Sequence, residues 1–185
     1  MRLALLWIGS YAFLHQNPVA LANELVNSTI ELDDKHSEYE LNLSGSIFVD
    51  KTSKLSFEHI QKFARFSGIG NKLVNEGFTD ATIWIKYDIS NTFHAPKEMI
   101  LEYVTYGYHD VTLYQQNANN PWTIKKLDRE THHRFLTQSL RFEPDKQKII
   151  YLKIKTPEAI QSSSKLKTRK AFMEDTAASY GLLGL

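Results

Sequence analysis

The 185-residue sequence contains no cysteine, and this absence excludes several classes of protein. A disulfide scaffold, a thiolate nucleophile and a cysteine-based metal site all require a side chain that the chain lacks. An oxidising compartment stays open, because a domain of this length can bury a sizeable core and needs no disulfide to fold.

The sequence also lacks an excess of charge of one sign. Lys plus Arg number 22 and Asp plus Glu number 21, which gives a formal net charge of +1. Because a domain that binds nucleic acid usually carries a clear basic excess, we expect no nucleic-acid partner. Hydrophobic residues make up 42% of the chain and charged residues 23%, which is the balance of one soluble globular domain.

No apolar run is long enough to span a bilayer, for which about 20 residues are needed. The N-terminus has Arg2, an apolar stretch over residues 3–14 and an A-x-A cleavage site that ends at Ala22. This is the layout of a secretory signal peptide, so we expect residues 1–22 to be removed and the mature chain to be exported to a bacterial periplasm. An uncleaved N-terminal anchor or a buried helix is the alternative.

Sequence signatures of catalysis are missing. The chain has no G-x-S-x-G elbow and no glycine-rich phosphate loop, and no two carboxylates stand out as the pair that glycoside hydrolysis needs. His132 and His133 are adjacent, so on a strand they would point to opposite faces and could not easily bind one metal ion. We therefore expect no enzyme, no metal site and no cofactor, with a secreted hydrolase as a distant alternative.

What the sequence does contain is the two-residue period of β-strands. In residues 81–91, ATIWIKYDISN, polar residues alternate with Ile83, Ile85, Tyr87 and Ile89. Trp84 falls on the otherwise polar face of this strand. It is either covered by another layer of protein or a flat surface for a ligand, and we prefer the first interpretation.

Similar patterns recur along the chain. Further strands are expected at residues 28–32, 39–49, 98–104, 110–116, 122–127, 134–142, 148–156 and 165–172. One helical pattern follows Ser56, which can cap its N-terminus. We therefore predict an all-β fold, an antiparallel sandwich or barrel, with one short helix near residues 56–66. We interpret the basic run KLKTRK at residues 165–170 as a solvated strand face, with contact to an anion or a lipid headgroup as the alternative.

Tyrosines are concentrated in residues 102–114, EYVTYGYHDVTLY. A tyrosine has an apolar ring and a polar tip, which suits partly wet surfaces and stacking on sugar rings. If a ligand site exists, we expect it around Tyr106, Tyr108, Arg134 and the neighbouring loops. Packing in the core or across strands is the alternative for each tyrosine.

Several stretches resemble the type 2 extracellular domain of bacterial seven-transmembrane receptors with diverse intracellular signalling modules. They are WIKYDISN, MILEYVTYGYHDVTLYQQNANNPW, HHRF and YLKIKTPEAIQSSSKLKTRKAF, and an upstream acidic turn, FVDKTSKLSFEHI, in which Asp50 is the acid. The resemblance covers roughly residues 40–175. Recurrent positions of the family fall on Trp84, Asp110, Tyr114 and Arg134.

The resemblance implies a jelly-roll-like antiparallel β-sandwich that senses a small molecule, carbohydrate above all, in the periplasm. A parent receptor in the inner membrane would pass the signal through seven helices to a cytoplasmic module. The expected organisation is a signal peptide (1–22), a lead-in (23–39), the sensor domain (40–175) and the juxtamembrane start of a truncated transmembrane helix (176–185). The candidate ligand-binding residues are Tyr106, Tyr108, Arg134, Trp84 and Asp110.

One alternative function stays open. The exposed aromatic residues could instead meet another protein chain, which would make this an ectodomain for protein contact or homodimerisation with no ligand. A flat apolar patch of more than a few hundred Å² would favour this reading, and a concave aromatic face would favour ligand binding.

Overall fold

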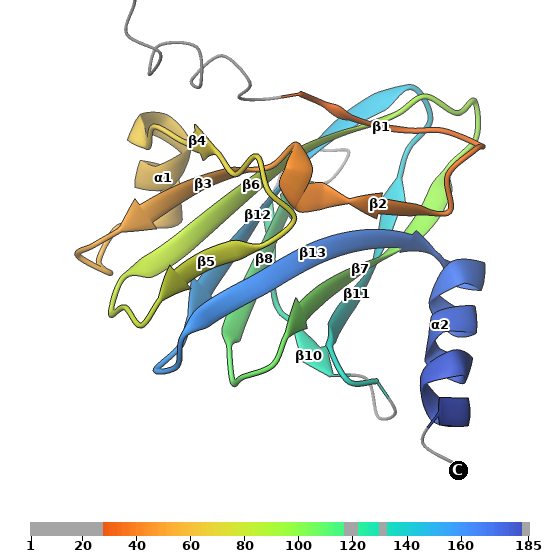
Figure 1. The fold of residues 1–185 in the computed structure, drawn as a ribbon. Helices are drawn as coiled ribbons and strands as arrows, with labels where there is room; N and C mark the ends of the chain where they lie inside the picture. The colour runs from red at the N-terminus through yellow and green to blue at the C-terminus, as the bar shows by residue number, and fades with distance from the viewer. Residues whose placement is uncertain (1–27, 117–121, 130–132, 183–185) are drawn as a thin grey trace, which may run out of the picture.

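The computed structural model describes residues 28–116, 122–129 and 133–182, the last three of these by backbone alone. The chain forms two facing sheets, predominantly antiparallel (Figure 1). The first sheet contains β1 (Ile30–Leu32), β3 (Ser46–Asp50), β4 (Ser67–Gly68), β6 (Thr82–Asn91), β8 (Asp110–Gln116), β9 (Trp122–Lys126) and β12 (Lys146–Lys155). The second contains β2 (Glu38–Glu40), β5 (Val74–Gly77), β7 (Lys97–Thr105), β10 (Asp128–Arg129), β11 (Leu136–Phe142) and β13 (Ile160–Thr168). The predicted all-β sandwich is confirmed.

The two sheets have different strand orders and share the N-terminal segment. In the first sheet the path is β4-β3-β6-β12-β8-β9, and in the second it is β10-β11-β7-β13-β2. Neighbouring strands in each path are antiparallel, whereas β1 runs parallel to β6. Because β1 and β2 belong to different sheets, the segment around residues 30–40, expected as a lead-in, already joins both layers of the sandwich.

The core lies between the two sheets and follows from the two-residue period. On β6, the inward side chains of Ile83, Ile85, Tyr87 and Ile89 are all fully buried. They meet Leu101 and Tyr103 from β7 in the opposite sheet. Burying each large apolar side chain of this kind contributes about 1.5–3 kcal/mol, so this face fixes the register of the central strands.

A helix covers the outer face of the first sheet. The helix α1 (Phe57–Phe63) begins after Ser56, whose side chain accepts a hydrogen bond from the backbone N–H of His59 at 3.2 Å. It places Phe57 and Ile60 against Trp84, which is fully buried. The ring of Phe57 lies stacked 6.1 Å from that of Trp84. Trp84 is therefore covered by another layer of protein.

The turn that leads into α1 is held by Asp50. This carboxylate is almost fully buried and accepts hydrogen bonds from the backbone N–H groups of Thr52, Ser53 and Leu55, at 3.0, 3.1 and 3.0 Å. The hydroxyl of Thr52 donates a further bond at 2.7 Å. The acid that the resemblance singles out thus closes the turn that positions the helix over Trp84.

Replacing Asp50 by asparagine is expected to destabilise the domain by about 1–2 kcal/mol at neutral pH, because charge-assisted hydrogen bonds are lost. Burial by itself raises the pKa of Asp50, but the bonds from Thr52, Leu55 and Ser53 outweigh it and leave the pKa below its usual 3.8. A carboxyl with a lowered folded pKa contributes stability above its unfolded pKa and loses it as the pH falls through the folded value. Urea unfolding of the wild type and the variant should therefore differ at pH 7 and converge below pH 3.8. The exposed Asp34→Asn is the control, and a pH-independent difference would contradict the assignment.

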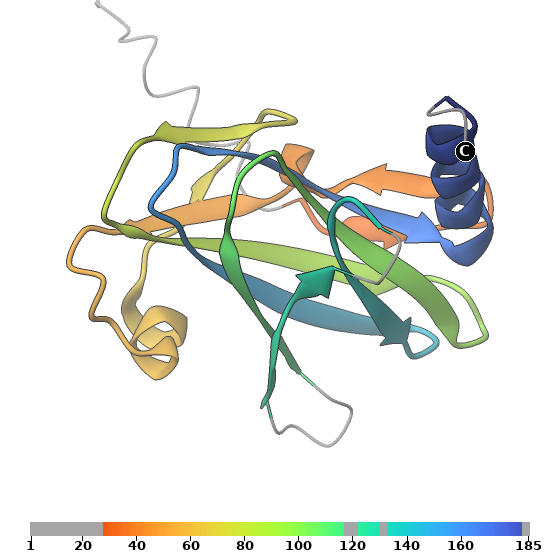
Figure 2. The same cartoon turned by 90° about the horizontal axis from the view of Figure 1, so that it is seen from below.

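A second helix covers the outer face of the other sheet. The helix α2 (Arg169–Leu182) follows β13 directly, so residues 169–172, expected at the end of a strand, are helical instead. Phe172 and Met173 of α2 line a cavity of about 410 Å³ with Ile100 of β7. Figure 2 shows α1 and α2 on opposite sides of the sandwich. Within the described residues, no helix has the length and apolar character that a membrane span requires.

Candidate functional site

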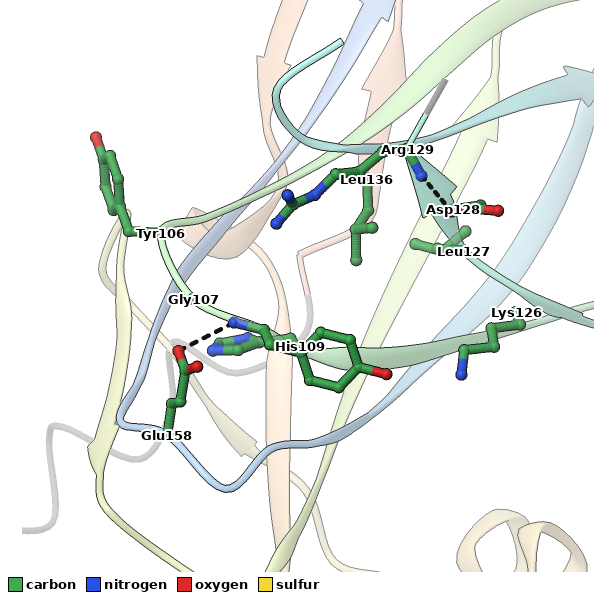
Figure 3. A pocket seen from close by; sticks show the side chains of 10 residues that line it. Tyr106, Gly107, His109, Lys126, Leu127, Asp128, Arg129, Leu136 and Glu158 are labelled. Atoms are coloured by element: carbon green, nitrogen blue, oxygen red, sulfur yellow. Dashed lines mark hydrogen bonds between the residues drawn. The ribbon is translucent and has the colours of Figure 1, made fainter. Parts of the chain in front are cut away.

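The candidate site is a cavity at one end of the sandwich, the lower end in Figure 1. The β7–β8 loop, the β9–β10 segment, the start of β11 and the β12–β13 loop meet there. The cavity has a volume of about 510 Å³, which is within the range of small-molecule sites. Its lining residues are Tyr106, Gly107, Tyr108, His109, Lys126, Leu127, Asp128, Arg129, Leu136 and Glu158 (Figure 3).

Two loops of the cavity hold each other in place. The backbone N–H of Tyr108 donates to the Glu158 carboxylate at 3.0 Å, and the hydroxyl of Thr156 donates to the carbonyl oxygen of Tyr108 at 2.6 Å. Gly107 lies so close to Glu158 that a Cβ atom at this position would be 1.9 Å from its Oε2. A larger residue at position 107 would therefore displace the Glu158 carboxylate that accepts the bond from Tyr108.

His109 forms the buried floor of the β7–β8 loop. Its Nδ1 lies 2.8 Å from the hydroxyl oxygen of Tyr103, and its ring nitrogens lie 3.2–3.3 Å from the hydroxyl of Thr105. Burial lowers the pKa of His109 below its usual 6.5, and this outweighs the opposing effects of Ala159 and Glu158. The imidazole is consequently neutral at pH 7 and acts as a fixed polar group.

The charged groups of the cavity have both signs. Lys126 makes an ion pair with Asp110 at 3.2 Å, and the hydrogen bond and charge of Asp110 raise the pKa of this lysine. Arg129 and Asp128 lie on β10, and Glu158 lies on the opposite loop. In Figure 3 the guanidinium of Arg129 points into the space between Tyr106 and Leu136. The cavity thus offers both donors and acceptors to a polar ligand.

The aromatic groups of the cavity are exposed. Tyr106 is 76% exposed and Tyr108 is 63% exposed, although both are large side chains with apolar rings. The guanidinium of Arg134 lies over the ring of Tyr106, 5.1 Å from its centre, and this restricts the ring at the rim. Exposed rings beside charged donors and acceptors provide the two kinds of contact that a sugar or another small polar molecule needs.

The structure brings four of the five predicted site residues to this end of the molecule. Tyr106 and Tyr108 line the cavity, Arg134 contacts the ring of Tyr106, and Asp110 reaches the cavity through its ion pair with Lys126. The fifth, Trp84, offers no surface to a ligand, because α1 buries it on the outer face of the first sheet.

Other lining residues were not predicted. Arg129 and Glu158 carried no sequence signal beyond the turn-like composition of their surroundings. Asp110 pairs with Lys126, whereas Arg134 lies over the rings of Tyr106 and Phe135. Of the adjacent histidines, His132 lies outside the described residues, and His133 lies 2.8 Å from a carboxylate oxygen of Glu102. Across the described residues, no three side chains of His, Asp or Glu gather as metal ligands would.

Comparison with known families gives one match. A family model described as 7TMR-DISM extracellular 2 matches residues 44–168, which is more than half of the chain. The match begins just before β3 and ends at the last residue of β13, so it includes every strand and loop that lines the cavity. No curated protein sequence matches the chain.

Proposed function

The chain belongs to the family of type 2 extracellular domains of the 7TMR-DISM receptors, and we propose that it binds a small polar ligand in the cavity at the end of the sandwich. Membership of this family makes it a receptor sensor domain outside the cytoplasm. A carbohydrate is the ligand class that we favour. The exposed rings of Tyr106 and Tyr108 would stack on the apolar face of a sugar, while Arg129 and Glu158 would exchange hydrogen bonds with its hydroxyls.

The observation that carries this proposal is the exposure of two tyrosines at the rim of a concave site. A tyrosine that only stabilises the fold is normally buried, as Tyr103 is in this protein. Tyr106 and Tyr108 are instead held at the surface by a loop that is fastened to the β12–β13 loop. Because the backbone of this loop is already held at Tyr108, less entropy would be lost in ordering the loop when a ligand is captured.

We propose a role in binding rather than in catalysis, with a periplasmic location that follows from the predicted signal peptide. The neutral and buried His109 makes structural bonds to Tyr103 and Thr105. The proposed role of the domain is to change the state of its parent receptor. The membrane helices that the family resemblance leads us to expect would connect the domain to the rest of that receptor.

A screen of melting temperatures tests the proposal. The mature chain is heated with and without monosaccharides, oligosaccharides, amino acids and organic acids. A ligand at 100 times its dissociation constant should stabilise the domain by about 2.7 kcal/mol, which raises the melting temperature measurably. Tyr108→Ala should abolish the shift while the unliganded variant melts close to the wild type, because the substituted ring is exposed.

The control for this experiment is Phe78→Ala, which removes an exposed aromatic ring that does not line the cavity. This variant should keep the full shift. A compound that stabilises wild type and Tyr108→Ala equally would show that the ligand binds elsewhere.

A second function is supported by one observation, the exposed edge of the first sheet. Within the described residues, β9 pairs on one side only, with β8, and its Ile124 is 64% exposed. An unpaired strand edge with an exposed apolar side chain can pair with another chain. If no compound of the melting-temperature screen stabilises the domain and analytical ultracentrifugation shows a dimer, this contact function is favoured over ligand binding.

A further inference from the structure

An ionic network joins α2 to the second sheet; it is buried at Lys167 and Glu102, whereas the side chain of Asp175 on α2 is 57% exposed. Lys167 of β13 is 5% exposed in its side chain, and its ammonium lies 2.7 Å from a carboxylate oxygen of Glu102 and 2.7 Å from one of Asp175. Glu102 belongs to the central strand β7, and Asp175 belongs to α2. One ammonium group therefore ties the helix to the strand that continues into the β7–β8 loop of the cavity.

The segment His133–Leu136 connects this network to the same helix by a second route. His133 lies 2.8 Å from the other carboxylate oxygen of Glu102, and its ring centre is 4.5 Å from that of Phe172 in α2. Both contacts depend on the position of one imidazole. A displacement of His133 would change a partner of the buried carboxylate and a packing contact of the helix together.

The other end of the segment reaches the cavity. The ring of Phe135 lies 6.0 Å from that of His133 and 6.3 Å from that of Tyr106. The guanidinium of Arg134 lies above both Tyr106 and Phe135, at 5.1 and 5.4 Å from the ring centres. Leu136 itself lines the cavity. A continuous series of side-chain contacts therefore runs from the cavity rim to α2.

We propose that residues 133–136 couple the state of the cavity to the docking of α2 on the second sheet. This inference rests on the proposed function, since it assigns to the cavity ligand a way of acting on the helix. A ligand that stacks on Tyr106 competes with Arg134 for the face of the ring and shifts the 133–136 segment. His133 then moves relative to Glu102 and Phe172, and the docked and undocked populations of α2 change.

In the proposed coupling, the ion pairs of Lys167 distinguish two arrangements of α2, docked and undocked. With α2 docked, Asp175 adds to the set of carboxylates that neutralise Lys167. With α2 undocked, Lys167 keeps Glu102 but loses Asp175, and its surroundings become accessible to water. Energetic coupling between two sites requires an element with distinct arrangements that both sites can bias. The helix α2 fits this requirement, because its Phe172 contacts His133 of the segment that reaches the cavity and its Asp175 contacts Lys167 of the sheet.

Amide hydrogen exchange of the full chain, with no ligand added, tests the coupling. Asp175→Asn should increase the exchange rate of residues 169–179 by about fivefold or more, the change that corresponds to the lower end of typical coupling energies. Arg134→Ala and Phe135→Ala should increase the same rates, although neither residue belongs to α2. By reciprocity, Asp175→Asn should also change exchange in the β7–β8 loop.

Matched controls separate coupling from general loosening. Glu174→Gln changes the neighbouring acid of α2, which faces Lys170 at 3.9 Å rather than the sheet, and should leave the exchange of α2 unchanged. Phe78→Ala removes an exposed aromatic ring that does not line the cavity and should also leave the exchange of α2 unchanged. If Phe135→Ala unfolds the domain, the exposed Arg134→Ala still tests the proposal.

The outcomes also separate this inference from the proposed function. If Asp175→Asn accelerates exchange of α2 but Arg134→Ala and Phe135→Ala do not, α2 docks independently of the cavity and the coupling is overturned, whatever the melting screen shows. If the variants accelerate exchange while the panel gives no hit, the coupling stands and the identity of the ligand class is what fails.

Discussion

Replacing Trp84 by alanine is expected to destabilise the domain by about 3–5 kcal/mol, the cost of removing a large aromatic side chain from a packed interior. Trp84 is fully buried between the first sheet and α1, where it packs with Phe57, Tyr114 and Tyr151. Its loss leaves a cavity that the strand cannot collapse to fill, because β6 is the central strand between β3 and β12. Urea unfolding followed by circular dichroism measures the change.

Two further variants make this prediction specific. Trp84→Phe should cost clearly less, because the indole Nε1 has no hydrogen-bond partner among the described residues and its removal relieves a buried unsatisfied donor. Phe63→Ala alters an aromatic residue on the solvent side of α1 and should change the stability by less than about 0.5 kcal/mol. A Trp84→Ala variant as stable as the wild type would mean that α1 does not cover this face in solution.

Trp84 also shows what the sequence can predict about the fold. Its position on the polar side of an alternating strand could be predicted from residues 81–91 alone. The capping role of Ser56 could likewise be predicted from the residues that follow it. Both features are local, since a period of two and a helix cap depend on neighbours a few residues apart. The covering of Trp84 by α1 agreed with the expectation, because an aromatic residue on an outer face needs a second layer.

The cavity was predictable only in part, because its walls come from distant parts of the chain. Tyr106 and Tyr108 were identified by their concentration in one short segment. Glu158, which fastens their loop, lies 50 residues from Tyr108. No pattern within either segment indicates that the two loops meet, and this information resides in the pairing of β12 with β8 and of β13 with β7.

The basic run at residues 165–170 is the clearest error of interpretation. Its alternation correctly placed Lys165 and Lys167 on one face of a strand, but the prediction that this face is solvated is wrong for Lys167. The sequence pattern could not show that Glu102 on β7 and Asp175 on α2 lie against this face. Charge alternation defines a face, and only the sheet order and the helix position define what covers it.

Glu102 is the residue of this network whose replacement should have the largest effect. Changing it to alanine is expected to destabilise the domain by about 3–5 kcal/mol, because a buried ion pair that loses one member leaves the other charge without its partner. The side chain of Glu102 is 4% exposed and contacts both Lys167 and His133. Burial disfavours the charge of Lys167, but the hydrogen bonds that its ammonium donates to Asp175 and Glu102 outweigh this effect and raise its pKa in the wild type.

Glu98→Ala is the matched control, because Glu98 lies on the same strand and the same face but is exposed. It should change the free energy of unfolding by less than about 0.5 kcal/mol in the same urea titration. A double variant, Glu102→Leu with Lys167→Met, removes both charges and should recover much of the stability lost in Glu102→Ala.

The double variant also separates stability from coupling. It should keep the sheet folded while it removes the ammonium that holds Asp175, so α2 should exchange its amide hydrogens faster in a domain that remains stable. If Glu102→Ala costs less than about 1 kcal/mol, Lys167 is satisfied by Asp175 and Glu38 alone, and Glu102 is dispensable. A large cost that the double variant reverses would instead show that the buried charge pair is not needed for the stability of the sandwich.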